Sequence, residues 1–191
     1  MLKKLKRAHK ISQTSENLNV PPGQYVTEKF PILTFGSVPK VDINNWHLRF
    51  FGIGVKEVTM NWNELMNLQK ITVTSPFHCV TQWSRLKNKW AGVPFAEIVK
   101  YVGLKPEARY VMVHCFGGYT TNLSLDVLLM DDVLLAYELD GQLLSSEHGG
   151  PMRLVVPSRY GWKSAKWVNG LEFMSKDYPG FWEQRGYNMR G

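Results

Sequence analysis

The segment KITVTSPFHCVTQWSR, residues 70–85, is the stretch around which the chain is organised. Its first five residues, 70–74, read as a strand, and Gly92, Val93 and Pro94 downstream read as the opening of a helix. We therefore expect residues 75–85 to form the loop that leaves this strand. Loops at that position commonly bind ligands in sheet proteins.

The sulfur of Cys79 is the chemically distinctive atom of this loop. His78 and Arg85 are close in sequence and favour the thiolate over the thiol. A thiolate on such a loop serves as a nucleophile, a redox centre or a soft metal ligand. Cys115 is the other of the two cysteines, and two cysteines without a CxxC spacing predict neither a disulfide framework nor a structural zinc site.

Length and composition indicate one domain with a substantial core. The chain has 191 residues, of which 44% are hydrophobic and 13% aromatic. No apolar run approaches the roughly 18 residues that a membrane helix needs. We therefore expect no membrane partner.

The positive charge is concentrated at the N-terminus. Five of the net seven positive charges lie in residues 1–10, which contain no acid, so the remainder carries a net charge of two. A nucleic-acid-binding arm is one interpretation, but we favour a solvated tail over residues 1–20 and expect no nucleic-acid partner. No apolar segment follows the basic residues as in a signal peptide, so we expect a cytoplasmic protein whose domain spans residues 21–191.

The remaining pattern predicts an α+β fold with a mixed β-sheet and short helices. Asn61 and Glu64 predict a capped helix through Leu68, and a second helix is expected over residues 94–102, ending at Gly103. A short helix is also expected over residues 125–130. The predicted strands cover residues 46–50, 110–115, 120–123, 133–139, 142–144, 153–156 and 170–174. Residues 30–36 are apolar but contain Pro and Gly, which indicates an irregular segment lying on the core.

A second group of polar residues occupies residues 147–167. Arg153, Arg159, Lys163 and Lys166 surround a segment containing Gly and Ser, and this composition suits a phosphate-bearing ligand. An ordinary solvated face remains an alternative. A second alternative is that these cations pack on the rings of Trp162 and Trp167.

Four motifs together resemble the molybdopterin-binding domain of the sulfite oxidase family, and most of all its small single-domain bacterial and archaeal members. They are FHCVTQWS at 77–84, GGYTTN at 117–122, HGGPMRLVVP at 148–157 and YGWKSAKW at 160–167. The resemblance runs from about Pro21 to Tyr187. Each motif is modest alone, but the four occur in the order and at the spacing of the family.

The resemblance implies a cofactor, molybdopterin with molybdenum, and a set of residues that contact it. Cys79 matches the cysteine that ligates molybdenum. The cofactor-binding positions implied are Leu33, Thr34, Phe35, His78, Cys79, Cys115 (or its neighbour His114), His148, Arg153, Ser164, Ala165 and Lys166. We assign Cys79 and Arg85 to catalysis. Further candidates for the pocket, besides Arg85, are Trp83, Tyr119 and Tyr160.

The implied activity is two-electron or oxygen-atom transfer on a small-molecule substrate, with a separate protein or small molecule as electron donor or acceptor. The loop after Cys79 lacks the arginine-rich sequence of sulfite oxidases, so the substrate stays open, as does the oligomeric state. The alternatives are a metal-free enzyme with Cys79 as nucleophile and His114 or His148 as base, a non-catalytic binding module, or a buried core thiol.

Overall fold

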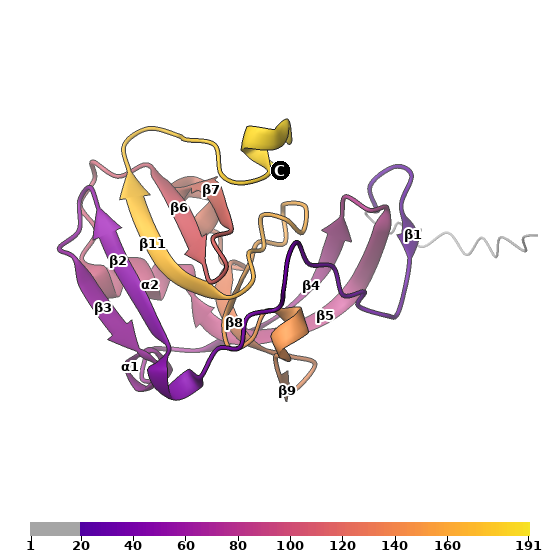
Figure 1. Ribbon diagram of the computed structural model, residues 1–191, viewed down its shortest axis with the longest axis horizontal. Helices are drawn as coiled ribbons and strands as arrows, with labels where there is room; N and C mark the ends of the chain where they lie inside the picture. The colour runs from indigo at the N-terminus through magenta and orange to yellow at the C-terminus, as the bar shows by residue number, and fades with distance from the viewer. Residues whose placement is uncertain (1–19) are drawn as a thin grey trace, which may run out of the picture.

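The computed structural model describes residues 20–191, which fold into two β-sheets side by side (Figure 1). One sheet has the order β1-β5-β8-β10, with β4 added to β5 and β9 to β8. Its strands are β1 (Tyr25–Val26), β4 (Ile71–Cys79), β5 (Trp83–Pro94), β8 (Leu134–Leu139), β9 (Gln142–Leu143) and β10 (Arg153–Val155). The second sheet has the order β3 (Val58–Asn61), β2 (His47–Gly52), β11 (Val168–Met174), β6 (Tyr110–Cys115) and β7 (Thr120–Ser124).

Both sheets mix parallel and antiparallel pairs. β1 pairs with β5 and β11 pairs with β2 in parallel, and the remaining pairs are antiparallel. The helices are short: α1 (Trp62–Met66), α2 (Phe95–Val102), α3 (Leu125–Leu128), η1 (Ile43–Asn45), η2 (Ser146–His148) and η3 (Glu183–Arg185). The predicted α+β class is confirmed, with the strands divided between two sheets.

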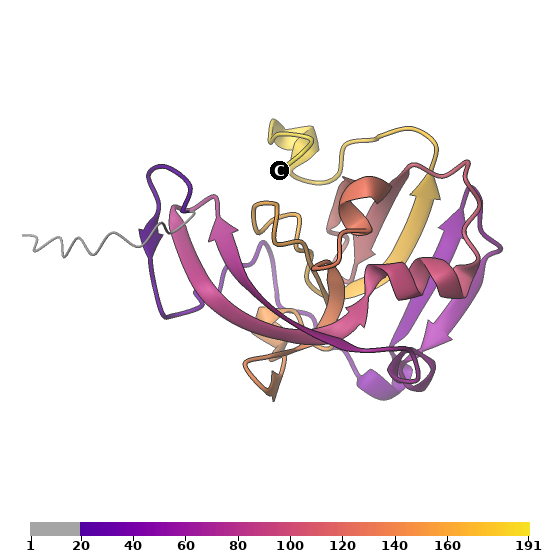
Figure 2. The same cartoon turned by 180° about the vertical axis from the view of Figure 1, so that it is seen from behind.

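The helix signals of the sequence are confirmed at α1 and α2. Asn61 and Glu64 form a reciprocal capping box at the start of α1, and Gly103 ends α2 in the left-handed conformation at φ 59°. α2 lies along one face of the five-stranded sheet and contributes the buried Phe95 and Ile98 to the larger of two apolar cores (Figure 2).

The smaller core is aromatic and lies beside the six-stranded sheet. Phe77, Trp83 and Trp90 form it with three aliphatic side chains, and Phe30 packs against it from outside the sheets. The ring centroids of Phe30 lie 4.9 Å from Phe77 and 5.4 Å from Trp83. These aromatic contacts fix residues 30–35, named here the strap, against the hairpin of β4 and β5.

The Cys79 stretch differs from the predicted loop. β4 continues through Cys79, three residues turn the chain, and β5 begins at Trp83. Gln82 closes the turn at φ 69°, and its N–H donates to the carbonyl of Cys79 over 3.1 Å. Cys79 therefore lies at the tip of a long hairpin that reaches away from the rest of the molecule (Figure 1).

Within residues 20–191, the structure contains no helix that is long and apolar enough to cross a membrane. The predicted basic tail lies outside the described residues apart from Val20. Its solvated character, and the cytoplasmic location inferred beside it, stay predictions.

Candidate active site

A cavity of about 380 Å³ lies between the hairpin tip, the strap and the two segments that follow β10 and β11. Its volume falls in the range of small-molecule sites. The lining residues are Phe30, Pro31, Leu33, Thr34, Phe35, Phe77, Cys79, Val80, Thr81, Trp83, Tyr119, Arg153, Gly161, Trp162, Ser164, Ala165, Lys166, Trp167, Trp182 and Tyr187. Eight of the predicted cofactor-binding positions thus meet in one cavity, although they come from four separate parts of the sequence.

Cys79 is the free thiol of this cavity. The residue is partly exposed, and the hydroxyl of Thr81 donates to its Sγ over 3.1 Å. Both residues line the cavity because the tight turn folds Thr81 back beside the end of β4. A soft, accessible sulfur with a hydrogen-bond donor is a suitable ligand for a thiophilic metal.

Arg153 is the buried cation of the cavity. Its side chain is 1% exposed and donates to the carbonyls of His148 (2.8 Å) and Ser164 (2.9 Å). Its Nε is buried and has no hydrogen-bond partner among the described residues. Burial lowers the pKa of Arg153 to about 10, so the guanidinium remains charged at neutral pH. A buried charge with an unsatisfied donor beside a cavity indicates an anionic or hydrogen-bond-accepting ligand.

Residues 160–167, named here the cation loop, bring Ser164, Ala165 and Lys166 to the cavity. Ser164 is held by its Oγ, which accepts from the N–H of Val156 over 3.0 Å. The Nζ of Lys166 donates to the carbonyls of Leu33 (2.8 Å) and Glu147 (2.6 Å). Burial and the nearby Arg153 lower the pKa of Lys166 to about 8. Two carbonyl oxygens compensate this charge only in part, so the loop is suited to hold an anion.

Gly161 shows how closely the cation loop approaches the hairpin. Its N–H donates to the carbonyl of His78 over 2.7 Å, and a Cβ at this position would lie 2.6 Å from two ring carbons of Phe77. Only glycine permits this approach without a shift of the ring. The contact sets the distance between Cys79 and the cation loop.

Arg85 does not line the cavity, contrary to the expectation that it acts there with Cys79. It lies on β5, and its guanidinium binds the carboxylate of Asp140, the side chain of Asn88 and the carbonyl of Glu28. Side chains alternate along a strand, and this one projects toward the β8–β9 turn. Its observed contacts are structural.

The three remaining predicted positions also lie outside the lining. Cys115 is 5% exposed in the larger core, where burial raises the pKa of its thiol. The ring of His78 is hydrogen-bonded to the hydroxyl of Ser84, and burial lowers the pKa of His78. His148 supports the site from behind, since its Nε2 lies 3.1 Å from the carbonyl of Phe30 in the strap and its own carbonyl binds Arg153.

Sequence reasoning missed Phe30, Trp182 and Tyr187, which complete the aromatic walls of the cavity. Trp182 and Tyr187 stack with ring centroids 5.1 Å apart, and Phe35 lies 5.6 Å from Trp182. No local pattern marks these residues, because aromatic side chains are more often part of a core. Of the further pocket candidates, Trp83 and Tyr119 line the cavity and Tyr160 stacks on Trp162 behind it.

The chemistry of this lining fits a molybdenum–pterin cofactor. Cys79 offers the thiolate, Arg153 an unsatisfied buried donor, and Lys166 a partly compensated charge for a phosphate. Residues 35–182 match the family described as the oxidoreductase molybdopterin binding domain. Because this match covers most of the chain, the protein belongs to that family and is a molybdopterin-dependent oxidoreductase.

Similar proteins agree with this assignment. The chain is 43% identical to an uncharacterized oxidoreductase, YuiH, of Bacillus subtilis, over 95% of this chain and 92% of that protein. It is 32% identical to a putative protein-methionine-sulfoxide reductase subunit, YedZ1, of Azospira oryzae, over 89% of this chain and 66% of that protein. The sulfane dehydrogenase SoxCD of Paracoccus pantotrophus shares the fold, with a TM-score of 0.67 and 23% identity over 73% of this chain and 40% of that one. The predicted family, fold and cofactor are confirmed.

Proposed function

We propose that the protein carries out oxygen-atom transfer, or a related two-electron reaction, on a small substrate, with Cys79 as the protein ligand of molybdenum. One observation carries the proposal: the accessible thiol of Cys79 shares a cavity with Arg153, Ser164 and Lys166. The bound cofactor supplies the redox chemistry, and the protein supplies binding and orientation.

The side chains divide this work between two ends of the cavity. At the hairpin tip, Thr81 donates to the Cys79 sulfur and limits its rotation. At the other end, Arg153 and Lys166 supply positive charge for the phosphate of the pterin, and Ser164 is fixed by the N–H of Val156. The aromatic walls exclude water between the two ends.

The metal-free alternative requires a base hydrogen-bonded to Cys79, and residues 20–191 place none there. Within residues 20–191 the Cys79 sulfur has one side-chain partner, the hydroxyl of Thr81. The imidazole of His114 binds Glu172 at 2.9 Å, and the imidazole of His148 binds Ser145 and the strap. A nucleophilic cysteine requires a base within hydrogen-bond reach, so the geometry favours the metal-ligand role.

The lining favours a neutral substrate over an oxyanion. Arg153 and Lys166 are its only charged side chains among the described residues, and both lie where the pterin phosphate is expected. The rest of the lining is mainly apolar and aromatic. We therefore propose an S-oxide or similar neutral oxygen donor, reduced with electrons from a separate partner. The relative in Azospira oryzae is named as a reductase subunit, which supports such a partner.

The direct test begins with holoenzyme purified from cells that synthesise and insert the cofactor. Metal analysis by plasma mass spectrometry and fluorescence of the released, oxidised pterin give the occupancy of the site. Reduction of a small sulfoxide with a reduced viologen dye is then compared with oxidation of sulfite by ferricyanide. The proposal expects sulfoxide reduction to be the faster reaction, and preferential oxidation of sulfite contradicts the neutral-substrate assignment.

A Cys79→Ser variant tests the metal ligand. It should lose turnover while keeping the fold, because a serine hydroxyl is a poor replacement for a thiolate on a soft metal. Cys115→Ala is the matched control, since that thiol lies in the core outside the cavity. A fully active Cys79→Ser protein rejects the proposal.

A further inference from the structure

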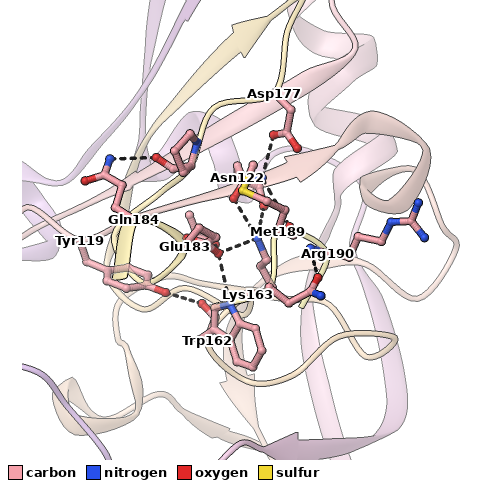
Figure 3. Close-up of polar contacts among 12 residues, drawn as sticks. Tyr119, Asn122, Trp162, Lys163, Asp177, Glu183, Gln184, Met189 and Arg190 are labelled. Atoms are coloured by element: carbon pink, nitrogen blue, oxygen red, sulfur yellow. Dashed lines mark hydrogen bonds and ion pairs between the residues drawn. The ribbon is translucent and has the colours of Figure 1, made fainter. Parts of the chain in front are cut away.

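A buried ion pair joins the cation loop to the C-terminal part of the chain (Figure 3). The Nζ of Lys163 lies 2.6 Å from Oε1 of Glu183, and both side chains are 0% exposed. Lys163 belongs to the cation loop, and Glu183 begins the short helix η3. Neither side chain lines the cavity, so the pair has no place in the binding machinery described above.

Both side chains of the pair make further hydrogen bonds, although Oε2 of Glu183 is buried and has no hydrogen-bond partner among the described residues. Lys163 also donates to the carbonyl and the side-chain oxygen of Asn122, at 2.7 and 2.9 Å. Oε1 of Glu183 accepts from Thr121 (3.1 Å) and from Trp162 (3.2 Å). A buried pair with this many partners fixes the geometry of the segments that carry it. Here it fixes residues 180–187, named the C-terminal wall, against the cation loop and β7.

The C-terminal wall is also part of the cavity. Trp182 and Tyr187, which flank Glu183 and the helix η3, both line it. Tyr187 meets Trp162 of the cation loop edge to face at 5.1 Å, and Phe35 of the strap packs on Phe181 and Trp182. The wall thus bridges the strap and the cation loop, the two segments expected to enclose the pterin.

The wall is attached to the rest of the molecule at its start and end, whereas the connector before it is exposed. Residues 175–178, after β11, are all exposed, and Figure 1 shows the C-terminal segment returning from β11 toward the loop that follows β10. Gly180 packs closely on β7, because a Cβ there would lie 2.6 Å from Cα of Thr121. The Lys163–Glu183 pair is the buried polar contact at the centre of this attachment.

We infer that Lys163 and Glu183 are positioning residues that hold the C-terminal wall over the molybdopterin, so that the pair controls how long the cofactor stays bound. Arg153 and Ser164 lie 1% and 2% exposed at the inner side of the cavity. A cofactor that reaches them must pass one of the covering segments. The wall is the covering segment whose position depends on an ion pair outside the cavity. Because the inference concerns cofactor retention, it is independent of the substrate proposed above.

The test measures the release of pterin from purified holoenzyme, as fluorescence of the oxidised pterin that appears in a filtrate over time. Glu183→Gln leaves Lys163 without its counter-charge, and release should be about tenfold faster or more, since removing one partner of a buried pair is strongly disruptive. Trypsin should also cut faster at Lys176, in the exposed connector. Lys163→Met combined with Glu183→Leu removes both charges and should restore slow release, because an apolar pair of similar volume is usually tolerated.

Trp182→Ala keeps the ion pair but removes part of the wall, and it should also accelerate release. If Glu183→Gln does not fold, a wild-type release rate in Trp182→Ala still overturns the inference. Gln184→Ala is the matched control, since that side chain is exposed and its one hydrogen bond among the described residues goes to the carbonyl of Pro179, just before the wall. Wild-type release rates in the Trp182 variant overturn the role of the wall. Fast release in that variant with wild-type release in Glu183→Gln overturns the role of the pair.

Discussion

The Nζ of Lys166 donates to the carbonyl oxygen of Leu33 over 2.8 Å, a contact between residues 133 positions apart in the sequence. It ties the strap to the cation loop, and both residues line the cavity. The contact places an ammonium group among partners that carry only partial charge. Its protonation is therefore sensitive to pH and to any anion that enters the cavity.

Lys166→Met should change how the stability of the cofactor-free protein depends on pH. The folded-state pKa of Lys166, about 8, lies below its ordinary value of 10.5. Between these values the unfolded chain binds more protons, so the contribution of this group to the unfolding free energy rises with pH and is flat below pH 8. Wild-type protein should therefore gain stability relative to the variant as the pH rises from 8 to 10.5, as measured by urea unfolding. Lys176→Met, at an exposed lysine, should show no such difference.

Arg153→Lys should lower both stability and cofactor content. Lysine keeps the charge but does not reproduce the planar fork that reaches the carbonyls of His148 and Ser164 together. We expect a loss of about 2–3 kcal/mol in the unfolding free energy from two charge-assisted hydrogen bonds. Pterin and molybdenum per protein should fall with it. Arg159→Lys is the control, because Arg159 also belongs to the polar group at residues 147–167 but does not line the cavity. Wild-type cofactor content in Arg153→Lys would argue that Arg153 does not bind the pterin.

Arg85→Gln should cost stability without affecting turnover. The ion pair of Arg85 with Asp140 is partly exposed and should contribute about 1 kcal/mol or less. Turnover divided by molybdenum content should match that of the wild type. A large loss of turnover at normal molybdenum content would return Arg85 to the catalytic role that the sequence predicted.

Gly161→Ala should destabilise the protein and reduce its cofactor content. The new methyl group would overlap the ring of Phe77, at 2.6 Å from two of its carbons. Overpacking of this kind costs about 1–3 kcal/mol. A second change, Phe77→Leu, provides the missing space and should recover part of the loss, as measured by thermal unfolding and pterin fluorescence. If the double variant is no more stable than Gly161→Ala, the ring is not the source of the strain.

Elements with local signals could be predicted from the sequence. The capping box of Asn61 and Glu64 and the left-handed Gly103 depend on neighbouring residues, and both helix ends are as expected. The strands predicted over residues 133–139 and 142–144 also form and pair with each other as β8 and β9. By contrast, β4 passes through Pro76 as a strand, because its pairing with β5 shifts register between Ser75 and Phe77. A proline is tolerated at such an irregularity, which no local rule identifies.

The candidate site also contains residues that motifs mark and residues that only long-range contacts place. The four motifs identified Cys79, Arg153 and the cation loop, which do share a cavity. The sequence did not show that Arg85 lies outside the cavity, because Asp140, its partner, is 55 residues away in the sequence. Trp182 and Tyr187 are held at the cavity by long-range contacts, among them the Lys163–Glu183 pair and the packing of Tyr187 on Trp162. Sequence patterns of helices and strands carry no signal for such a contact.

The spread of the lining along the chain has a consequence for biosynthesis. The cavity draws its walls from positions between Phe30 and Tyr187, so it is incomplete until almost all of these residues have left the ribosome and folded. The parallel pairing of β11 with β2 adds a similar delay, because the sheet that supports the wall closes only with a late strand. The complete cavity is therefore available to the cofactor only after residues 30–187 have been synthesised and folded.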